Sequence, residues 1–149
     1  MNAKLLIVLP LSIILAMVIY FVANPSYEKS LEAEYYYEIG DYKEAYSRAR
    51  EAFSMDMYNR MASTVMAQSK TAMKYEKYID EAKKYMKEIN AIAAKESISD
   101  ADRAKIKMMS EIMVNSYIKL APSVITHKSL VKEAKKYYED FGKLLEKVD

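Results

Sequence analysis

Apolar side chains fill the first part of the chain without interruption. Residues 5–23 read LLIVLPLSIILAMVIYFVA and include no charged side chain. At 1.5 Å per residue, a helix over these positions is about 28 Å long, which is close to the hydrocarbon thickness of a bilayer. Because the run has no polar face, it is not typical of the core helix of a globular domain. We expect residues 1–24 to form an N-terminal anchor, with a transmembrane helix over residues 5–23.

A cleaved secretory signal is the alternative interpretation of this segment. Signal sequences have a shorter apolar region, followed by small residues at the cleavage site. Here the run is longer, and Phe21 occupies a position, two before Ala23, where a small side chain is needed. The α-amino group and Lys4 precede the run, whereas Glu28 and Lys29 beyond it cancel. The positive-inside rule then predicts a cytoplasmic N-terminus and an extracytoplasmic domain, which in a bacterium is periplasmic.

Beyond a break at residues 24–26, apolar positions recur with the spacing of amphipathic helices. Gly40 is suited to a left-handed helix end, and Asp41, followed three residues later by Glu44, is suited to the start of the next helix. Ser99, also followed by an acidic residue three positions on, gives another start signal. We expect residues 26–149 to form one domain with six helices, at about 27–39, 41–54, 57–73, 76–95, 102–120 and 127–147.

The composition supports an all-α fold. Only 2 Gly and 3 Pro occur in 149 residues, so the chain lacks the turn residues that a β-rich domain of this size would need. Lys and Arg number 23 against 21 Asp and Glu, and the two signs are interspersed. A nucleic-acid-binding protein would show a clustered basic stripe, so we expect no nucleic-acid partner. The absence of Cys excludes a disulfide framework and a thiolate metal site.

A short pattern recurs three times in the predicted helices. An apolar residue, a charged residue and Glu-Ala occur as YKEA at residues 42–45, IDEA at 79–82 and VKEA at 131–134. The intervals are unequal, whereas a regular array of helical hairpins repeats about every 34 residues. A plain helical bundle is the alternative, because Glu-Ala-Lys strings arise easily in such a composition. The coincidence of the Gly-Asp turn with the aromatic positions favours a repeat.

Residues 33–45, which read AEYYYEIGDYKEA, resemble a tetratricopeptide repeat. In that family a small residue and a Tyr of the first helix face Tyr and Ala positions of the second. In this chain Ala33 and Tyr36 would face Tyr42, Ala45 and Ala52. The match is good over residues 27–56, partial over 57–90 and limited to the second helix of a pair over 102–145. The resemblance implies three stacked helical hairpins, which form a short α-solenoid.

Two positions depart from the family's pattern. Lys77 replaces the Gly of the second turn, and Met57 stands where the family usually has Pro. Met57 lies at the junction between the first and the second expected hairpin, where the family's Pro would stand.

The resemblance also implies a surface for a partner protein or peptide. In the family the concave face is lined by the first helix of each pair. Carried over to this chain, the partner-binding positions are Tyr27, Ser30, Glu34, Tyr37 and Glu38. Tyr offers a large contact area at low entropic cost. The alternative is that these residues simply face solvent near the membrane.

Other side chains are predicted to belong to the core or to the solvated surface. Tyr35 and Tyr37 cannot both face inward at helical spacing, so one of them must be exposed. Met108 and Ile112 widen an apolar stripe and predict a helix that is buried on two sides; a Met-rich groove for varied partners is the alternative. The core positions of that stripe are Ile106, Met109, Met113, Tyr117 and Leu120. Three pairs at i,i+4 spacing are expected to form surface ion pairs, namely Glu44–Arg48, Asp80–Lys84 and Glu139–Lys143.

No motif for catalysis or metal binding occurs. The chain has no glycine-rich phosphate loop and no HExxH, and its single histidine, His127, has no Cys or second His as a partner. We expect no catalytic residue, no metal, no cofactor and no enzymatic activity.

The layout is similar to that of single-anchor periplasmic tetratricopeptide proteins that assist envelope protein secretion or assembly. It predicts a membrane-anchored scaffold for another protein. The alternative is a structural membrane protein that self-associates through its anchor or exposed helix faces and has no peptide-binding groove. The oligomeric state stays open.

Overall fold

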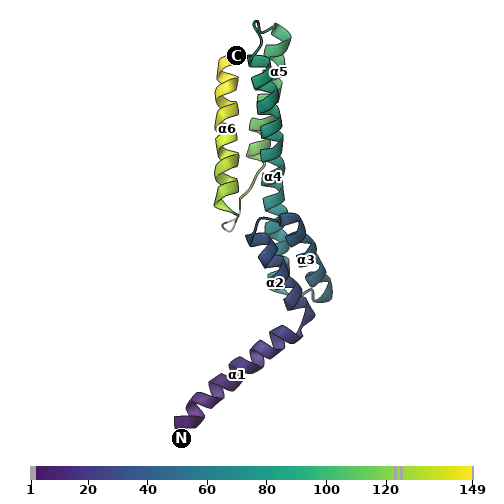
Figure 1. Cartoon of the computed structure of the whole chain (residues 1–149), viewed down its shortest axis with the longest axis vertical. Helices are drawn as coiled ribbons and strands as arrows, with labels where there is room; N and C mark the ends of the chain where they lie inside the picture. Colours follow the sequence, from purple (N-terminus) through teal and green to yellow (C-terminus); the bar gives the residue numbers. More distant parts are fainter. Residues whose placement is uncertain (1–2, 123, 125, 149) are drawn as a thin grey trace. The chain divides into compact units, whose positions relative to one another are not determined.

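The computed structural model describes residues 3–122, 124 and 126–148, and over these residues it contains six helices and no strand (Figure 1). The all-α fold class is confirmed. The chain divides into two compact units, Met1–Lys70 and Thr71–Asp149. The helices are α1 (Ala3–Ala23), α2 (Pro25–Glu38), α3 (Tyr42–Met55), α4 (Arg60–Ala93), α5 (Asp100–Ile118) and α6 (Lys128–Val148).

Helix α4 corrects one prediction. The break expected between residues 73 and 76 does not occur, and the two helices predicted at 57–73 and 76–95 are one continuous helix of 34 residues. The residues at the expected break are Lys74, Tyr75 and Glu76, none of which ends a helix. The second of the three expected hairpins is therefore absent. Helix α4 contributes its N-terminal part to the first unit and the rest to the second.

In the first unit, α1 and α2 meet at the predicted break. They are bent by 80°, and Asn24 between them has an extended backbone with φ −98° and ψ 108°. The Asn24 side chain accepts a hydrogen bond from the backbone N–H of Ser26, and Pro25 occupies the first helical position, where a missing N–H has no cost. Asn24, Pro25 and Ser26 therefore form the junction where α1 ends and α2 starts.

Helices α2 and α3 form the predicted hairpin. Gly40 has φ +85°, a conformation that an L side chain rarely adopts. Asp41 caps α3, because its Oδ1 accepts a hydrogen bond of 3.0 Å from the backbone N–H of Glu44. Alanines line the crossing of the two helices and let the backbones approach closely. The fully buried ones are Ala33, Ala45, Ala49 and Ala52.

In the second unit, α5 and α6 pack against the C-terminal part of α4 (Figure 1). The core contains Tyr75 and Ile89 from α4, Met113 from α5 and Phe141 from α6. The five core positions predicted over residues 106–120 are confirmed, three as buried residues of α5 and two, Tyr117 of α5 and Leu120 just beyond its end, as partly buried ones. Expected burial on a second side of α5 is wrong: Met108 is 53 % and Ile112 40 % exposed, because no helix covers that face in the described residues.

Local signals fix the turn between α4 and α5. Ser99 and Asp102 form the reciprocal capping box expected from the sequence. Asp102 also accepts a hydrogen bond of 2.6 Å from Lys95 Nζ. These hydrogen bonds from Lys95 and Ser99 lower the pKa of the Asp102 carboxyl. The loop therefore holds a carboxylate at the helix start, where the helix dipole favours negative charge.

The three Glu-Ala segments share burial but not position. Ala45, Ala82 and Ala134 are all completely buried. However, Ala45 lies in the first turn of α3, Ala82 lies deep inside the long helix α4, and Ala134 lies in the second turn of α6. Each alanine marks a close helix contact, but the segments do not begin equivalent helices.

Candidate functional site

Helix α1 exposes apolar side chains on all sides. Every side chain from Ile7 to Ala23 is exposed, and the least exposed of the large ones, Phe21, is still 44 % accessible. Ser12 is a polar exception, and its hydroxyl donates to the carbonyl of Leu9 at 2.8 Å. The helix therefore offers no polar face and leaves this hydroxyl satisfied internally.

Within the described residues, no helix alone meets the length and composition expected of a membrane span. The segments Ile7–Ala23 and Pro25–Glu38 meet them only as a bent pair.

Aromatic rings gather at the bend between α1 and α2. Tyr27 lies 4.8 Å from Phe21 and 6.4 Å from Tyr20, measured between ring centroids, and Tyr20 and Phe21 are 5.9 Å apart. The edge-on contact of Tyr27 with Phe21 is a favourable arrangement of two rings. The bend is therefore lined by rings that each have an apolar body, two of them with a polar tip.

The five residues predicted to bind a partner do not share one surface. Glu34 and Glu38 are exposed and Tyr27 is half-buried. Ser30 and Tyr37 are buried, so their side chains are not available to a partner in this conformation. The prediction for these two residues is corrected, because the face of α2 that carries them packs against α3 and, at Ser30, against Asn59.

Ser30 belongs to a buried hydrogen-bond network that the sequence did not predict. Asn59 Nδ2 donates to the hydroxyls of Ser26 and Ser30, at 2.8 and 2.9 Å. The Ser26 hydroxyl donates to the carbonyl of Ala52, and Asn59 Oδ1 accepts from the backbone N–H of Ala62. Asn59 thus caps the helix that follows the hairpin. An Asn immediately before a helical run was the available signal.

The outer face of α2 is apolar and acidic. Tyr35 is 62 % exposed, whereas Tyr37, two residues away, is 3 % exposed. This resolves the predicted choice between them in favour of Tyr35 as the outward ring. Leu31, one turn earlier, is also exposed, and Glu34 and Glu38 lie beside it. A stripe of two large apolar side chains flanked by carboxylates therefore faces away from the hairpin.

A second surface lies in the other unit, where α4 and α6 leave a shallow groove of about 380 Å³. Its floor is apolar and consists of Met86 from α4 and Tyr137 and Leu144 from α6. Charged side chains stand along α6 beside this floor. They are Lys136, Asp140, Lys143 and Lys147.

Three buried tyrosines have pKa values above the ordinary value of a phenol. Burial raises the pKa of Tyr78, and Tyr117 and Tyr138 raise it further. Burial likewise raises the pKa of Tyr75 and of Tyr37. All three phenols therefore stay neutral in the folded protein at neutral pH. Among the described residues, no three His, Cys, Asp or Glu side chains come close enough together to hold a metal ion.

Comparison with models of protein families, with curated proteins and with solved structures finds no match to this chain.

Proposed function

We propose that this chain is a single-span membrane protein that holds another protein or peptide beside the bilayer. The observation that carries the proposal is the unbroken exposure of uncharged side chains from Ile7 to Ala23. The uncharged run of residues 5–23 would extend about 28 Å as one helix, which is close to the hydrocarbon thickness of a bilayer. Lipid would remove from water the apolar surface that the rest of the chain leaves uncovered, at about 0.8 kcal/mol per buried CH₂ group.

The aromatic rings at the bend support an interfacial position for residues 20–27. Tyr and Phe rings favour the boundary between lipid and water. With Lys4 before the apolar run of residues 5–23 and cancelling charges beyond it, the N-terminus is cytoplasmic and helices α2 to α6 are extracytoplasmic. Because α2 begins immediately after α1, the hairpin α2–α3 starts at the membrane surface.

The outer face of α2 is the part of the original binding surface that this proposal retains. Glu34 and Glu38 remain candidates from the sequence, and Tyr35 and Leu31 replace the buried Tyr37 and Ser30. The tetratricopeptide-like arrangement is proposed for the α2–α3 hairpin alone, since α4 continues where a second hairpin would turn. The protein acts as an adaptor and not as an enzyme.

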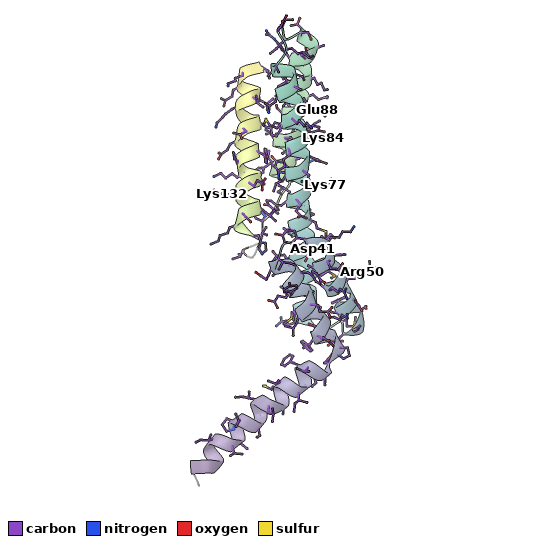
Figure 2. The ribbon with its side chains drawn as sticks, viewed as in Figure 1. Asp41, Arg50, Lys77, Lys84, Glu88 and Lys132 are labelled. Atoms are coloured by element: carbon purple, nitrogen blue, oxygen red, sulfur yellow. The ribbon has the colours of Figure 1, made fainter. Side chains whose placement is uncertain are left out.

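Site-specific photo-cross-linking in cells tests this assignment. A photoreactive residue at Tyr35 or Glu34 should give a discrete adduct with another protein. The matched control is Arg50, which is exposed on α3 of the same unit (Figure 2) and should give none. Combining Tyr35→Ala with Glu34→Ala should reduce recovery of the same partner. Adducts that are equal at Arg50 and Tyr35, or absent at both, would remove α2 as the binding surface.

Self-association is the second candidate, and one observation favours it. Met108 and Ile112 form an exposed apolar stripe on α5. A second copy could cover this stripe, which would make the protein structural rather than an adaptor. Light scattering of the full chain in mild detergent separates the two candidates. A monomer would exclude self-association, and a dimer that Met108→Lys dissociates would favour it.

A further inference from the structure

The groove between α4 and α6 combines an apolar floor with a cationic edge. Met86, Tyr137 and Leu144 form the floor. Lys136, Lys143 and Lys147 line the same groove, and all three are exposed. With Asp140 as the only acidic residue in the lining, three positive charges face one negative charge.

These lysines are not used to hold the fold together. The expected ion pair between Glu139 and Lys143 is not formed in the described residues. Glu139 pairs instead with Lys135, with 3.7 Å between Glu139 Oε1 and Lys135 Nζ. Glu133, an acidic residue nearer the start of α6, binds Lys83 of α4, with 3.0 Å between Glu133 Oε1 and Lys83 Nζ. Lys136, Lys143 and Lys147 have no ion-pair partner among residues 3–122, 124 and 126–148. Their charges are therefore available to a ligand.

We propose that this groove binds an acidic amphipathic helix of a partner protein. The lining residues of α6 run from Lys136 to Lys147, which corresponds to about 16 Å or three helical turns. A partner helix can place apolar side chains at i, i+3, i+4 and i+7 on the floor, as in helix-in-groove recognition. Glu or Asp residues along one flank of that helix would then face the three lysines. The inference rests on the proposed adaptor function and specifies the chemistry of a partner.

Other occupants fit the groove less well. A flat anionic lipid surface would meet the exposed lysines first, whereas side chains projecting from a helix can also contact the partly buried Met86, Tyr137 and Leu144. A second copy docking through the same groove would place lysines against lysines. Nucleic acid would need a continuous basic stripe, but Glu133, Glu139 and Glu146 are interspersed along α6.

Peptide binding to the full chain tests the proposal. The chain is placed in nanodiscs of zwitterionic lipid and titrated with a fluorescent helical peptide of about five turns. The peptide carries Leu on one face and Glu along its flanks, and a twin peptide carries Lys in place of Glu. We expect the Glu peptide to bind and to weaken as salt rises, and the Lys twin not to bind.

Charge reversal locates the site. Combining Lys136→Glu with Lys143→Glu should weaken binding of the Glu peptide by about tenfold or more. The matched control combines Lys77→Glu with Lys84→Glu, two residues of α4 (Figure 2). The change in charge is the same, and helical spacing puts both positions on the side of α4 opposite Met86. Binding by the control should be unchanged, and the Lys136/Lys143 variant should gain affinity for the Lys twin.

Three results would overturn the proposal. They are absence of Glu-peptide binding, equal losses in the two double variants, and binding of anionic vesicles in place of the peptide with loss in the Lys136/Lys143 variant. Because this assay does not involve Tyr35 or Glu34, its failure leaves the cross-linking test of the adaptor function standing. Conversely, peptide binding without any partner adduct at α2 would retain the groove and remove the α2 surface.

Discussion

At the scale of single residues, Asn59 joins three helices. Its side-chain NH₂ group donates hydrogen bonds to the hydroxyls of Ser26 and Ser30 on α2. Its side-chain oxygen accepts a hydrogen bond from the backbone N–H of Ala62 and so caps α4. The Ser26 hydroxyl in turn donates to the backbone carbonyl of Ala52 on α3. Every polar group of the Asn59 side chain is satisfied although the residue is fully buried. In a buried site, removal of such a group leaves its partners unpaired, which costs more than the bonds contribute.

Replacement of Asn59 by Ala is therefore expected to lower the free energy of unfolding by about 3 kcal/mol, from the lost hydrogen bonds and the lost helix cap. Asn90, an exposed residue of α4, provides the control, and Asn90→Ala should change stability by no more than about 0.5 kcal/mol. Urea unfolding of the full chain in micelles, followed by circular dichroism, measures both. Equal values for the two variants would mean that the network does not stabilise the first unit.

Tyr78 is a second residue whose environment leads to a prediction. Its ring is buried, and its hydroxyl has no hydrogen-bond partner among the described residues. Burial raises its pKa above the ordinary value of 10.0. In such a case the folded state keeps the proton more tightly than the unfolded state. The stabilisation is complete below pH 10 and is lost as the pH rises above it.

We expect alkaline unfolding to begin above pH 10 and to release tyrosines that do not ionise in the folded protein. Absorbance of tyrosinate, recorded together with circular dichroism, measures this. Tyr78→Phe removes an unpaired hydroxyl and should raise stability at neutral pH by about 1 kcal/mol, while Tyr35→Phe, at an exposed ring, should have no effect. A destabilised Tyr78→Phe would show instead that the hydroxyl is hydrogen-bonded in the native protein.

At the scale of helices, the sequence predicted most accurately where a local signal ends or starts an element. Gly40, Asp41 and Ser99 act within one turn of chain, so their positions could be read without knowing the fold. The predicted break before Glu76 had no such residue to support it. Tyr75, at that break, is buried in the core of the second unit, and this packing favours an uninterrupted helix.

The candidate site was predicted less well because it depends on contacts between helices and not on local signals. Residues on α2 could be assigned to faces by helical spacing, but the inward face depends on α3 and on Asn59, which is far along the chain from Ser30. Tyr35 and Tyr37 were correctly recognised as opposed, and only the structure shows which is exposed. The groove on α6 was missed because its floor needs Met86, which the fold brings from another helix.

Continuity of α4 gives a prediction at this scale. Lys74 is exposed in the middle of the helix, so Lys74→Pro removes a backbone hydrogen bond and introduces a steric clash without disturbing the core directly. We expect a loss of about 3 kcal/mol, whereas Lys74→Ala should be neutral. Amide hydrogen exchange should show protection through residues 71–78. A tolerated proline with fast exchange there would restore the turn expected from the repeat resemblance.

At the scale of the whole molecule, α1 differs from the other helices in how its apolar residues are used. In α3 and α6 one face is apolar and is covered by neighbouring helices, whereas α1 exposes apolar side chains all round. An apolar helix without a protein partner is stable in lipid, because its backbone hydrogen bonds are made internally. This is why the proposed location depends on α1, and why both proposed binding surfaces belong to the helices that follow it.

Charge placed in α1 tests this dependence. Combining Ile14→Lys with Val18→Lys puts two charges near the middle of the helix, at about 2.5–3.5 kcal/mol each for insertion. The variant should leave the carbonate-washed membrane fraction that retains the unaltered chain. Met57→Lys with Tyr58→Lys adds the same charge at exposed positions between α3 and α4 and should remain in the membrane. Retention of the α1 variant in washed membranes would exclude α1 as the anchor. The intact mass of the membrane-bound, unaltered chain should include residues 1–23. A mass that lacks these residues would identify a cleaved signal.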